Sequence, residues 1–303
     1  MTDGASLTAA RAPLPELYPF ASHFLELDGI RLHYLDEGEG EPVVMLHGNP
    51  TWSFYFRRLV SGLRNTHRLI VPDHIGCGLS DKPGDDRYDY TLARRVRDLE
   101  ALLDHLDLGG RVSLILHDWG GMIGMAHAVR HPERIRRIVV LNTAAFHLPE
   151  SKPLPFSLRL LRVPGIGAVL VRGLNLFCRS AASACCARGK MPADVRDAYL
   201  APYDSWAHRI AILRFVQDIP LRPGDRGYDL VTEVSEGLGG FVKTPMMICW
   251  GMKDFVFDED FLAEWVRRCP HAEVHRFDDA GHYILEDVPE EVLERVREFL
   301  NRE

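Results

Sequence analysis

The sequence of 303 residues contains no apolar run long enough to span a membrane. Its first 20 residues, MTDGASLTAARAPLPELYPF, lack the continuous apolar core of a secretory signal. There is no excess of positive charge either, because 36 Lys and Arg stand against 43 Asp and Glu, a formal net charge of −7. This balance gives no electrostatic reason to expect nucleic acid or an anionic membrane as a partner. We therefore predict a cytoplasmic protein without a transmembrane segment.

The six cysteines show neither C-x-x-C pairs nor regular spacing; they are Cys77, Cys178, Cys185, Cys186, Cys249 and Cys269. The adjacent pair at 185 and 186 is a poor framework for disulfides, so we expect reduced thiols. No ligand spacing fits a zinc site. The sequence predicts no metal and no other cofactor.

What the chain does have is a regular alternation of apolar strands and amphipathic helices. Residues 23–38 predict a hairpin that turns at Asp28-Gly29. Further strands are expected at 42–46, 68–71, 112–116, 135–141, 245–250 and 272–277, and helices at 52–63, 91–106, 120–130, 259–268 and 288–301. Such alternation builds an α/β protein with a mostly parallel sheet and helices on both faces.

Residues 146–240 interrupt this alternation, because they contain helix-like segments and little that resembles a strand. We interpret them as a helical lid, or cap, inserted into one α/β core made of residues 21–145 and 241–303. Residues 1–20 are expected to form a flexible N-terminus. The apolar, arginine-dotted face of the lid could lie on a membrane or a partner, but such a face more commonly lines the lid's underside and the pocket.

An acidic residue, Asp118, lies where the strand at 112–116 passes into small residues and a helix. A carboxylate beside buried apolar residues is costly unless it is used. Strand, tight turn and helix around one reactive residue is the layout of a nucleophile elbow, in which an acid and a histidine follow later in the chain. Asp254 and His282 each follow a predicted strand. A lone Asp after a strand is more commonly a helix N-cap, but three residues in the expected order predict a catalytic triad.

A carboxylate nucleophile is already ionised at neutral pH and needs no base to react. It suits attack on an electrophilic alkyl carbon, which releases an anion and leaves an ester of Asp118. Water activated by His282, with Asp254 orienting the imidazole, can then clear the ester. The departing anion needs N–H donors in a dry pocket, and Asn49 and Trp119 offer an amide and an indole N–H. Other histidines, His127 among them, are expected to be satisfied core or surface residues.

Several segments together resemble the haloalkane dehalogenase family of α/β-hydrolases: HGNPTWS at 47–53, PDHIGCGLSDKP at 72–83, HDWGG at 117–121, AYLAPY at 198–203, FVQDIP at 215–220 and GH at 281–282. The resemblance covers about residues 25–300. It implies the α/β-hydrolase fold, with a mostly parallel eight-stranded sheet and an inserted helical cap. It also implies Asp118 as the nucleophile, His282 as the base, and Asn49 with Trp119 as the clamp on the leaving anion.

The position of the triad's acid indicates which subfamily of the dehalogenases the sequence resembles. One branch of the family carries its acid after the sixth strand, where this sequence has Leu141-Asn142-Thr143 and no carboxylate, so Asp254 is the expected acid. Together with Asn49 and Trp119, this looks like the third dehalogenase subfamily. That subfamily includes the β-lactone decarboxylases of bacterial long-chain olefin biosynthesis, to which the segments 74–78, 141–148 and 202–206 are most similar.

The resemblance therefore implies decarboxylation of cis-3-alkyl-4-alkyl β-lactones (oxetan-2-ones) to cis-olefins and CO₂, by an enzyme that could assemble with others of a hydrocarbon pathway. A haloalkane dehalogenase, converting a 1-haloalkane and water to a primary alcohol and halide, is the alternative. An epoxide hydrolase would use Tyr199 and Tyr203 to protonate the epoxide oxygen, but Asn49 stands where that family usually carries a bulky apolar residue. A non-catalytic binding protein on the same fold is a further alternative. The Leu- and Val-rich segment 149–174 favours an apolar ligand in each case.

Overall fold

One eight-stranded sheet forms the centre of the computed structural model, which describes residues 15–149 and 152–302. The strand order is β1-β2-β4-β3-β5-β6-β7-β8. The strands are β1 (His23–Leu27), β2 (Ile30–Glu37), β3 (Glu41–Leu46), β4 (His67–Pro72), β5 (Val112–Asp118), β6 (Ile135–Thr143), β7 (Met246–Gly251) and β8 (Glu273–Phe277). Only β2 runs antiparallel to its two neighbours, β1 and β4, and the other pairs are parallel. The predicted mostly parallel eight-stranded sheet is confirmed.

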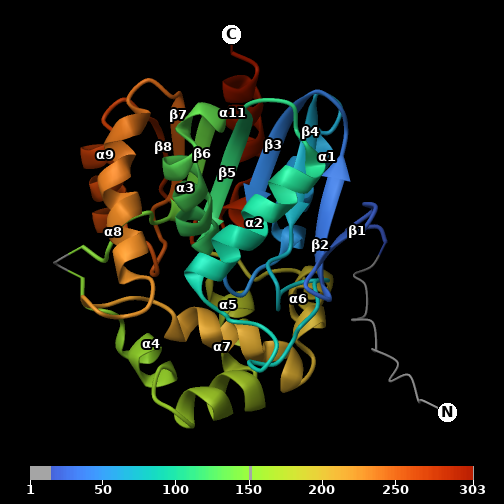
Figure 1. The fold of residues 1–303 in the computed structure, drawn as a ribbon, viewed down its shortest axis with the longest axis vertical. Helices are drawn as coiled ribbons and strands as arrows, with labels where there is room; N and C mark the ends of the chain where they lie inside the picture. Colours follow the sequence, from blue (N-terminus) through green and yellow to red (C-terminus); the bar gives the residue numbers. More distant parts are fainter. Residues whose placement is uncertain (1–14, 150–151, 303) are drawn as a thin grey trace.

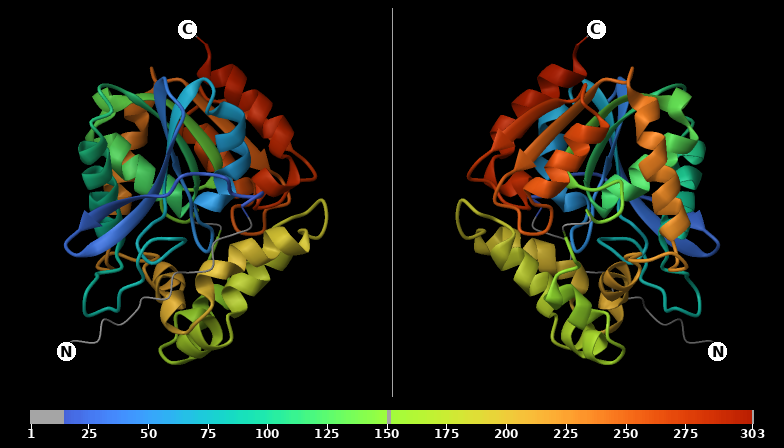
Figure 2. Two further views of the ribbon diagram at one scale, coloured as in Figure 1. Left: turned by 90° about the vertical axis from the view of Figure 1, so that its right-hand side faces the viewer. Right: turned by 90° about the vertical axis from the view of Figure 1, so that its left-hand side faces the viewer.

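Helices cover both faces of this sheet (Figures 1 and 2). On one face lie α2 (Leu92–Leu106), α3 (Trp119–Arg130) and α8 (Tyr228–Gly237), and on the other lie α1 (Arg57–Leu63) and α11 (Pro289–Leu300). Every residue of the central strand β5 is buried as a result. This explains why its sequence reads as a continuous apolar run rather than as an alternation.

The helices of the core begin and end close to the predicted positions. Thr91 caps α2, since its side chain accepts a hydrogen bond of 3.3 Å from the backbone N–H of Arg94. The remaining core helices are α9 (Glu259–Arg268) and the short α10 (Ile284–Asp287), and a 3₁₀ turn (Ser53–Phe56) precedes α1. Within the described residues, no helix combines the length and the apolar character needed to cross a bilayer.

The segment between β6 and β7 forms the lid, most of which lies at the lower end of the molecule in Figure 1, whereas its last helix lies beside the sheet. Its elements are α4 (Phe156–Leu161), a short π-helix (Ala168–Gly173), α5 (Leu176–Ala184), α6 (Ala193–Leu200), α7 (Ile210–Gln217) and α8, with 3₁₀ turns at Ala201–Tyr203, Ala207–Arg209 and Leu238–Phe241. The single helix-like run predicted from 166 to 182 is broken at Asn175, whose backbone is left-handed (φ 54°). A non-glycine residue with positive φ does not continue a right-handed helix.

The last lid helix, α8, packs against the core. A Cβ added at Gly237 would overlap the side chain of Val129 on α3, and Arg130 forms an ion pair with Glu233. The boundary between lid and core at residue 240 stays a prediction.

The predicted flexible N-terminus falls largely outside the described residues, but Tyr18 is buried, and its hydroxyl lies 2.5 Å from Ser53 Oγ.

Candidate active site

The backbone turns sharply at Asp118, the last residue of β5, before α3 begins at Trp119. Asp118 has φ 49° and ψ −126°, a conformation that costs free energy and persists only where neighbouring structure enforces it. Two glycines make the turn sterically feasible. A Cβ at Gly48 would overlap Asp118 Oδ1, and a Cβ at Gly120 would overlap the carbonyl oxygen of Leu46. This close packing of β3, the turn and α3 is the geometry of a nucleophile elbow.

The Asp118 carboxylate is nearly enclosed, with 7 % of the residue's surface exposed. Its Oδ1 accepts a hydrogen bond of 2.6 Å from the backbone N–H of Asn49. Burial raises the pKa of Asp118, while His282 and the backbone N–H groups of Asn49 and Trp119 oppose this rise. The pKa remains above that of an ordinary aspartate. Because Oδ1 is held by the backbone, Oδ2 is the oxygen free to react.

His282 links this carboxylate to a second one. Its Nδ1 lies 2.8 Å from Asp254 Oδ2, and its Nε2 lies 3.9 Å from Asp118 Oδ2. Burial lowers the pKa of His282, but the charge and hydrogen bond of Asp254 outweigh burial, so the pKa is raised overall. The end of β5 and the loops after β7 and β8 thus bring the three predicted residues Asp118, Asp254 and His282 together at the carboxyl edge of the sheet.

Asp254 itself is held by groups that the sequence analysis did not identify. Its Oδ1 accepts the backbone N–H of Val256 at 2.6 Å and that of Phe257 at 3.1 Å. Its Oδ2 accepts the side-chain amide of Asn142 at 2.9 Å. The sequence showed Asn142 only as a position without a carboxylate. Its place directly after the sixth strand was the available signal, because residues there meet the other strand ends.

His117 holds the backbone of His282 in place. Its Nε2 lies 3.0 Å from the carbonyl oxygen of His282, and since a carbonyl can only accept, this nitrogen carries the proton. Burial holds the pKa of His117 well below its usual value. A neutral His117 therefore anchors the backbone of His282 without adding charge to the site.

Asn49 and Trp119 lie beside the nucleophile, and both line the cavity described below. Asn49 Nδ2 donates a hydrogen bond of 3.1 Å to the carbonyl oxygen of Ile212 on lid helix α7, which leaves its second N–H available. In the described part of the chain, the indole N–H of Trp119 has no hydrogen-bond acceptor. Two residues that line the cavity beside the nucleophile therefore each have an N–H donor available for an anion that leaves the attacked carbon.

A cavity of about 620 Å³ lies between the lid and the carboxyl edge of the sheet. Asn49, Asp118, Trp119 and His282 line it, and the lid supplies mainly apolar side chains: Leu154, Leu158, Leu160, Leu161, Leu170, Leu176, Phe177, Val216 and Ile219. A volume of this size, apolar walls and a few convergent polar groups are typical of a small-molecule site. The cavity suits a ligand with apolar chains and one reactive centre.

Neither lid tyrosine considered for epoxide opening lines this cavity. The hydroxyl of Tyr199 donates to Glu286 Oε1 at 2.5 Å, and that of Tyr203 donates to the carbonyl oxygen of Thr51 at 3.1 Å. Both side chains are buried within the structure. The tyrosine pair therefore has a packing and hydrogen-bonding role, and the geometry does not support an epoxide hydrolase.

All six cysteines are unpaired, as predicted.

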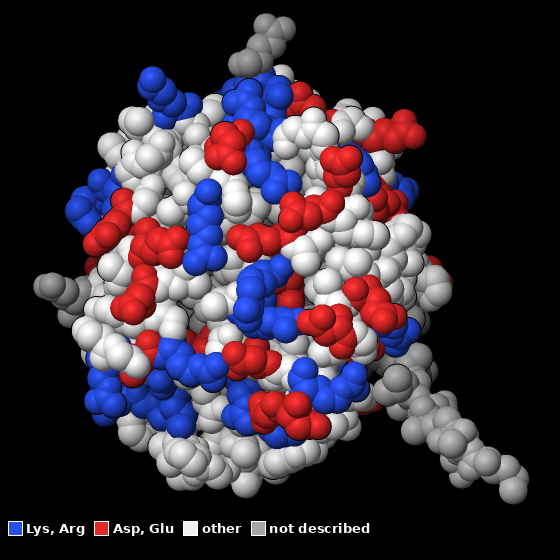
Figure 3. Space-filling model, viewed as in Figure 1, with Lys and Arg blue, Asp and Glu red and all other residues white. Residues whose placement is uncertain are grey.

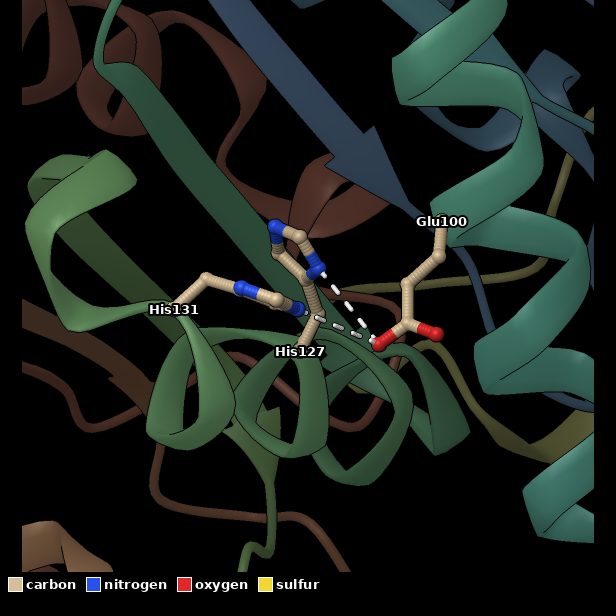
Figure 4. Close-up of side chains that lie close together, drawn as sticks. All are labelled: Glu100, His127 and His131. Carbon is tan, nitrogen blue, oxygen red and sulfur yellow. Dashed lines mark ion pairs between the residues drawn. The ribbon is translucent and has the colours of Figure 1, made fainter.

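One group in the described residues has the composition of a metal site: Glu100 on α2 with His127 and His131 at the end of α3 (Figure 4). His127 Nδ1 and His131 Nε2 lie 3.9 and 3.8 Å from Glu100 Oε1. The nine residues from Asp118 to His127 correspond to about 13 Å of helix, so this group takes no part in chemistry at Asp118. His127 is buried, and neither of its ring nitrogens has a hydrogen-bond partner in the described structure, so the prediction of a satisfied histidine was wrong.

A family model described as alpha/beta hydrolase fold matches residues 41–164 and 192–289. The chain belongs to the α/β hydrolase fold family. Two curated relatives of this α/β hydrolase are cis-3-alkyl-4-alkyloxetan-2-one decarboxylases. That of Shewanella oneidensis is 58 % identical and covers 95 % of this chain and 90 % of its own length. That of Xanthomonas campestris pv. campestris is 49 % identical and covers 94 % and 97 %.

Among solved structures, the haloalkane dehalogenase DatA from Agrobacterium tumefaciens C58 matches this α/β hydrolase with a TM-score of 0.84 at 26 % identity. The match covers 96 % of this chain and 99 % of that one. The predicted resemblance to the dehalogenases is confirmed, and so is the closer likeness to the β-lactone decarboxylases.

Proposed function

We propose that this α/β hydrolase decarboxylates cis-3-alkyl-4-alkyl β-lactones and releases a cis-olefin and CO₂. The observation that carries the proposal is the 58 % identity to a decarboxylase of that name over 95 % of the chain. The site fits such a substrate, because it combines a carboxylate nucleophile, two free N–H donors and a cavity of about 620 Å³ walled by the lid's apolar side chains. The reaction needs no cofactor, and unpaired cysteines support a reducing compartment such as the cytoplasm.

In the first step, Asp118 Oδ2 attacks C4, the ring carbon that bears the ring oxygen. The C4–O bond breaks, and its electron pair leaves on a carboxylate attached to C3. The strained ring supplies part of the driving force. Asn49 Nδ2 and Trp119 Nε1 then stabilise the new carboxylate, as they would a halide. The product of this step is an alkyl ester of Asp118.

In the second step, the bond between C3 and the carboxylate carbon breaks. Its electron pair forms the C3–C4 double bond, and the bond from C4 to Asp118 breaks at the same time. CO₂ and the olefin are released, and Asp118 returns as a carboxylate. Neither water nor an external proton is consumed, so His282 and Asp254 contribute charge and positioning in this route rather than a base.

Attack at the acyl carbon C2 is a second route. It would give a mixed anhydride and an alkoxide on C4, and the alkoxide would need a proton from His282, whose Nε2 lies 3.9 Å from the nucleophile. The two routes therefore differ in how strongly they depend on His282.

Haloalkane hydrolysis is the second candidate function, favoured by the structural match to DatA. In that reaction Asn49 and Trp119 would hold a halide, and water activated by His282 would hydrolyse the ester of Asp118. The deciding experiment offers the purified protein a cis-dialkyl β-lactone or 1-bromohexane and measures olefin with CO₂, or bromide. Olefin without appreciable bromide would support the decarboxylase. Bromide without olefin would make the protein a dehalogenase, and tight lactone binding without any product would indicate a binding protein.

A further inference from the structure

One stretch of the lid contains basic side chains that are only partly paired with acids. Residues 152–190 contain no Asp or Glu but seven basic residues: Lys152, Arg159, Arg162, Arg172, Arg179, Arg188 and Lys190. Lys152 pairs with Asp258 of the core, and Arg188 pairs with Asp279 and Glu291. The four arginines between them have no ion-pair partner in the described residues. The net charge of −7 conceals this local excess.

The same stretch exposes apolar side chains to solvent. Six of the eleven large hydrophobic residues that are exposed in the described structure fall within it: Phe156, Val163, Ile166, Val169, Leu174 and Leu176. Phe156 is 77 % exposed and Val169 is 54 % exposed. They come from α4, the π-helix, α5 and the turns between them, which we call the lid tip (residues 156–179). Figure 3 shows uncharged surface at the lower end of the molecule, where Figure 1 places the lid, with both basic and acidic side chains above it.

The lid tip is apolar on its inner side as well. Leu158, Leu161, Leu170 and Phe177 line the cavity above Asp118. Leu176 belongs to both sets, since it is exposed to solvent and also lines the cavity. The outer apolar surface and the wall of the cavity therefore meet at this residue.

We propose that the lid tip docks on the surface of an anionic lipid bilayer. Exposed apolar side chains flanked by arginines are the combination that enters the headgroup region, where the apolar groups reach the acyl chains and the cations meet anionic headgroups. The four arginines without an ion-pair partner supply the charge complementarity, and two of them, Arg159 and Arg179, are exposed. Docked in this way, the cavity opens at Leu176 toward the acyl chains, from which an apolar substrate can enter. The docking does not depend on whether that substrate is a lactone or a haloalkane.

Vesicle co-sedimentation of the full chain tests the docking without reference to turnover. We expect the protein to sediment with vesicles of phosphatidylcholine and phosphatidylglycerol but not with phosphatidylcholine alone, and to be released by added salt. Replacing Arg159 and Arg179 by Gln should weaken binding about 25-fold, given about fivefold for each cation near the surface. Both side chains are exposed and unpaired, so the double variant should keep its melting temperature.

The apolar contribution has a matched control. Val169→Asp places a charge in the lid tip and should reduce binding to anionic vesicles more than tenfold. Val242→Asp makes the same change at a valine that is 63 % exposed outside the lid tip, and binding should be retained. Equal losses in the two variants, or no binding of the unmodified chain at low salt, would overturn the proposal. Self-association that disappears in Val169→Asp, without vesicle binding, would assign the lid tip to a second copy of the chain instead.

Discussion

Asp254 Oδ2 accepts a hydrogen bond from the side-chain amide of Asn142 at 2.9 Å, and the same oxygen lies 2.8 Å from His282 Nδ1. The side chain of Asn142 is itself held in place, because its Oδ1 accepts a hydrogen bond of 2.8 Å from the backbone N–H of Gly251. The backbone of Asn142 has φ 35°, which asparagine and aspartate tolerate better than most residues. The end of β6 and the loop after β7 are thus joined at the acid that orients the imidazole.

This arrangement predicts that the acid can be moved to position 142. Asp254→Ala should lower the pKa of His282, because the charge and the hydrogen bond of Asp254 no longer oppose the burial of the imidazole and only the charge of Asp118 remains to do so. Adding Asn142→Asp should restore much of the pKa of His282, since the side chain of residue 142 reaches the position that Asp254 Oδ2 occupies. NMR titration of His282 in the two variants measures this directly. A pKa that stays low in the double variant would show that residue 142 does not reach the imidazole.

The alkyl route predicts unequal effects at the nucleophile and the histidine. Asp118→Ala should reduce olefin formation by about 10⁴-fold or more, whereas His282→Ala should cost less than about 10²-fold, because no base is needed. Olefin release under saturating lactone is the measurement. A loss in His282→Ala as large as in Asp118→Ala would rule the alkyl route out. The thermal stability of each variant serves as the control for folding.

Trp119→Phe should distinguish the contribution of the indole N–H to catalysis from the packing contribution of the aromatic ring. Phenylalanine retains much of the contact with Phe215, whose ring centroid lies 5.2 Å from that of Trp119, but it offers no donor to the leaving carboxylate. Removing one preorganised donor typically costs on the order of a hundredfold in kcat. Lactone kinetics would show this as a fall in kcat with little change in KM. A pure rise in KM would mean that the indole binds the substrate and does not stabilise the developing anion.

His127 predicts a specific dependence of stability on pH. Burial, with the charges of His131 and Arg134 adding to it, lowers the pKa of His127 to about 4. The unfolded value is about 6.5, so the unfolded chain takes up the proton first. The free energy of unfolding should be unaffected above pH 6.5 and should fall as the pH drops toward 4, by about 3 kcal/mol from this residue.

Urea unfolding of His127→Met at pH 7.5 and pH 5 checks this expectation. Methionine places no polar atom without a hydrogen bond in the core, so the variant should be at least as stable as the parent protein at pH 7.5 and should exceed it by a wider margin at pH 5. His105→Gln, a change at an exposed histidine of α2, is the matched control and should alter neither value. Equal acid sensitivity of the parent and His127→Met would contradict the assignment.

The core strands and the three residues after β5, β7 and β8 could be predicted because their signals are local. A buried parallel strand needs a continuous apolar run, and a reactive residue at its end follows it directly in sequence. Asn142 was missed as a functional residue because its importance depends on the position of Asp254, which lies 112 positions away. Helix α8 was not singled out, since its apolar side is defined by α3, which it packs against. Likewise, no pattern in the lid indicated that Tyr199 turns toward Glu286 and away from the cavity.

The close packing of the turn around Asp118 also limits which substitutions this sequence can accept in evolution. Gly48 and Gly120 have no room for even one additional carbon, so a replacement at either position displaces the nucleophile. Gly165 and Gly189 in the lid would meet nothing within 4 Å. A saturation library selected for olefin release should therefore keep the first pair and accept many residues at Gly189. We expect descendants of this chain to acquire new substrate preferences by drift in the lid while the reacting acid and its turn stay as they are.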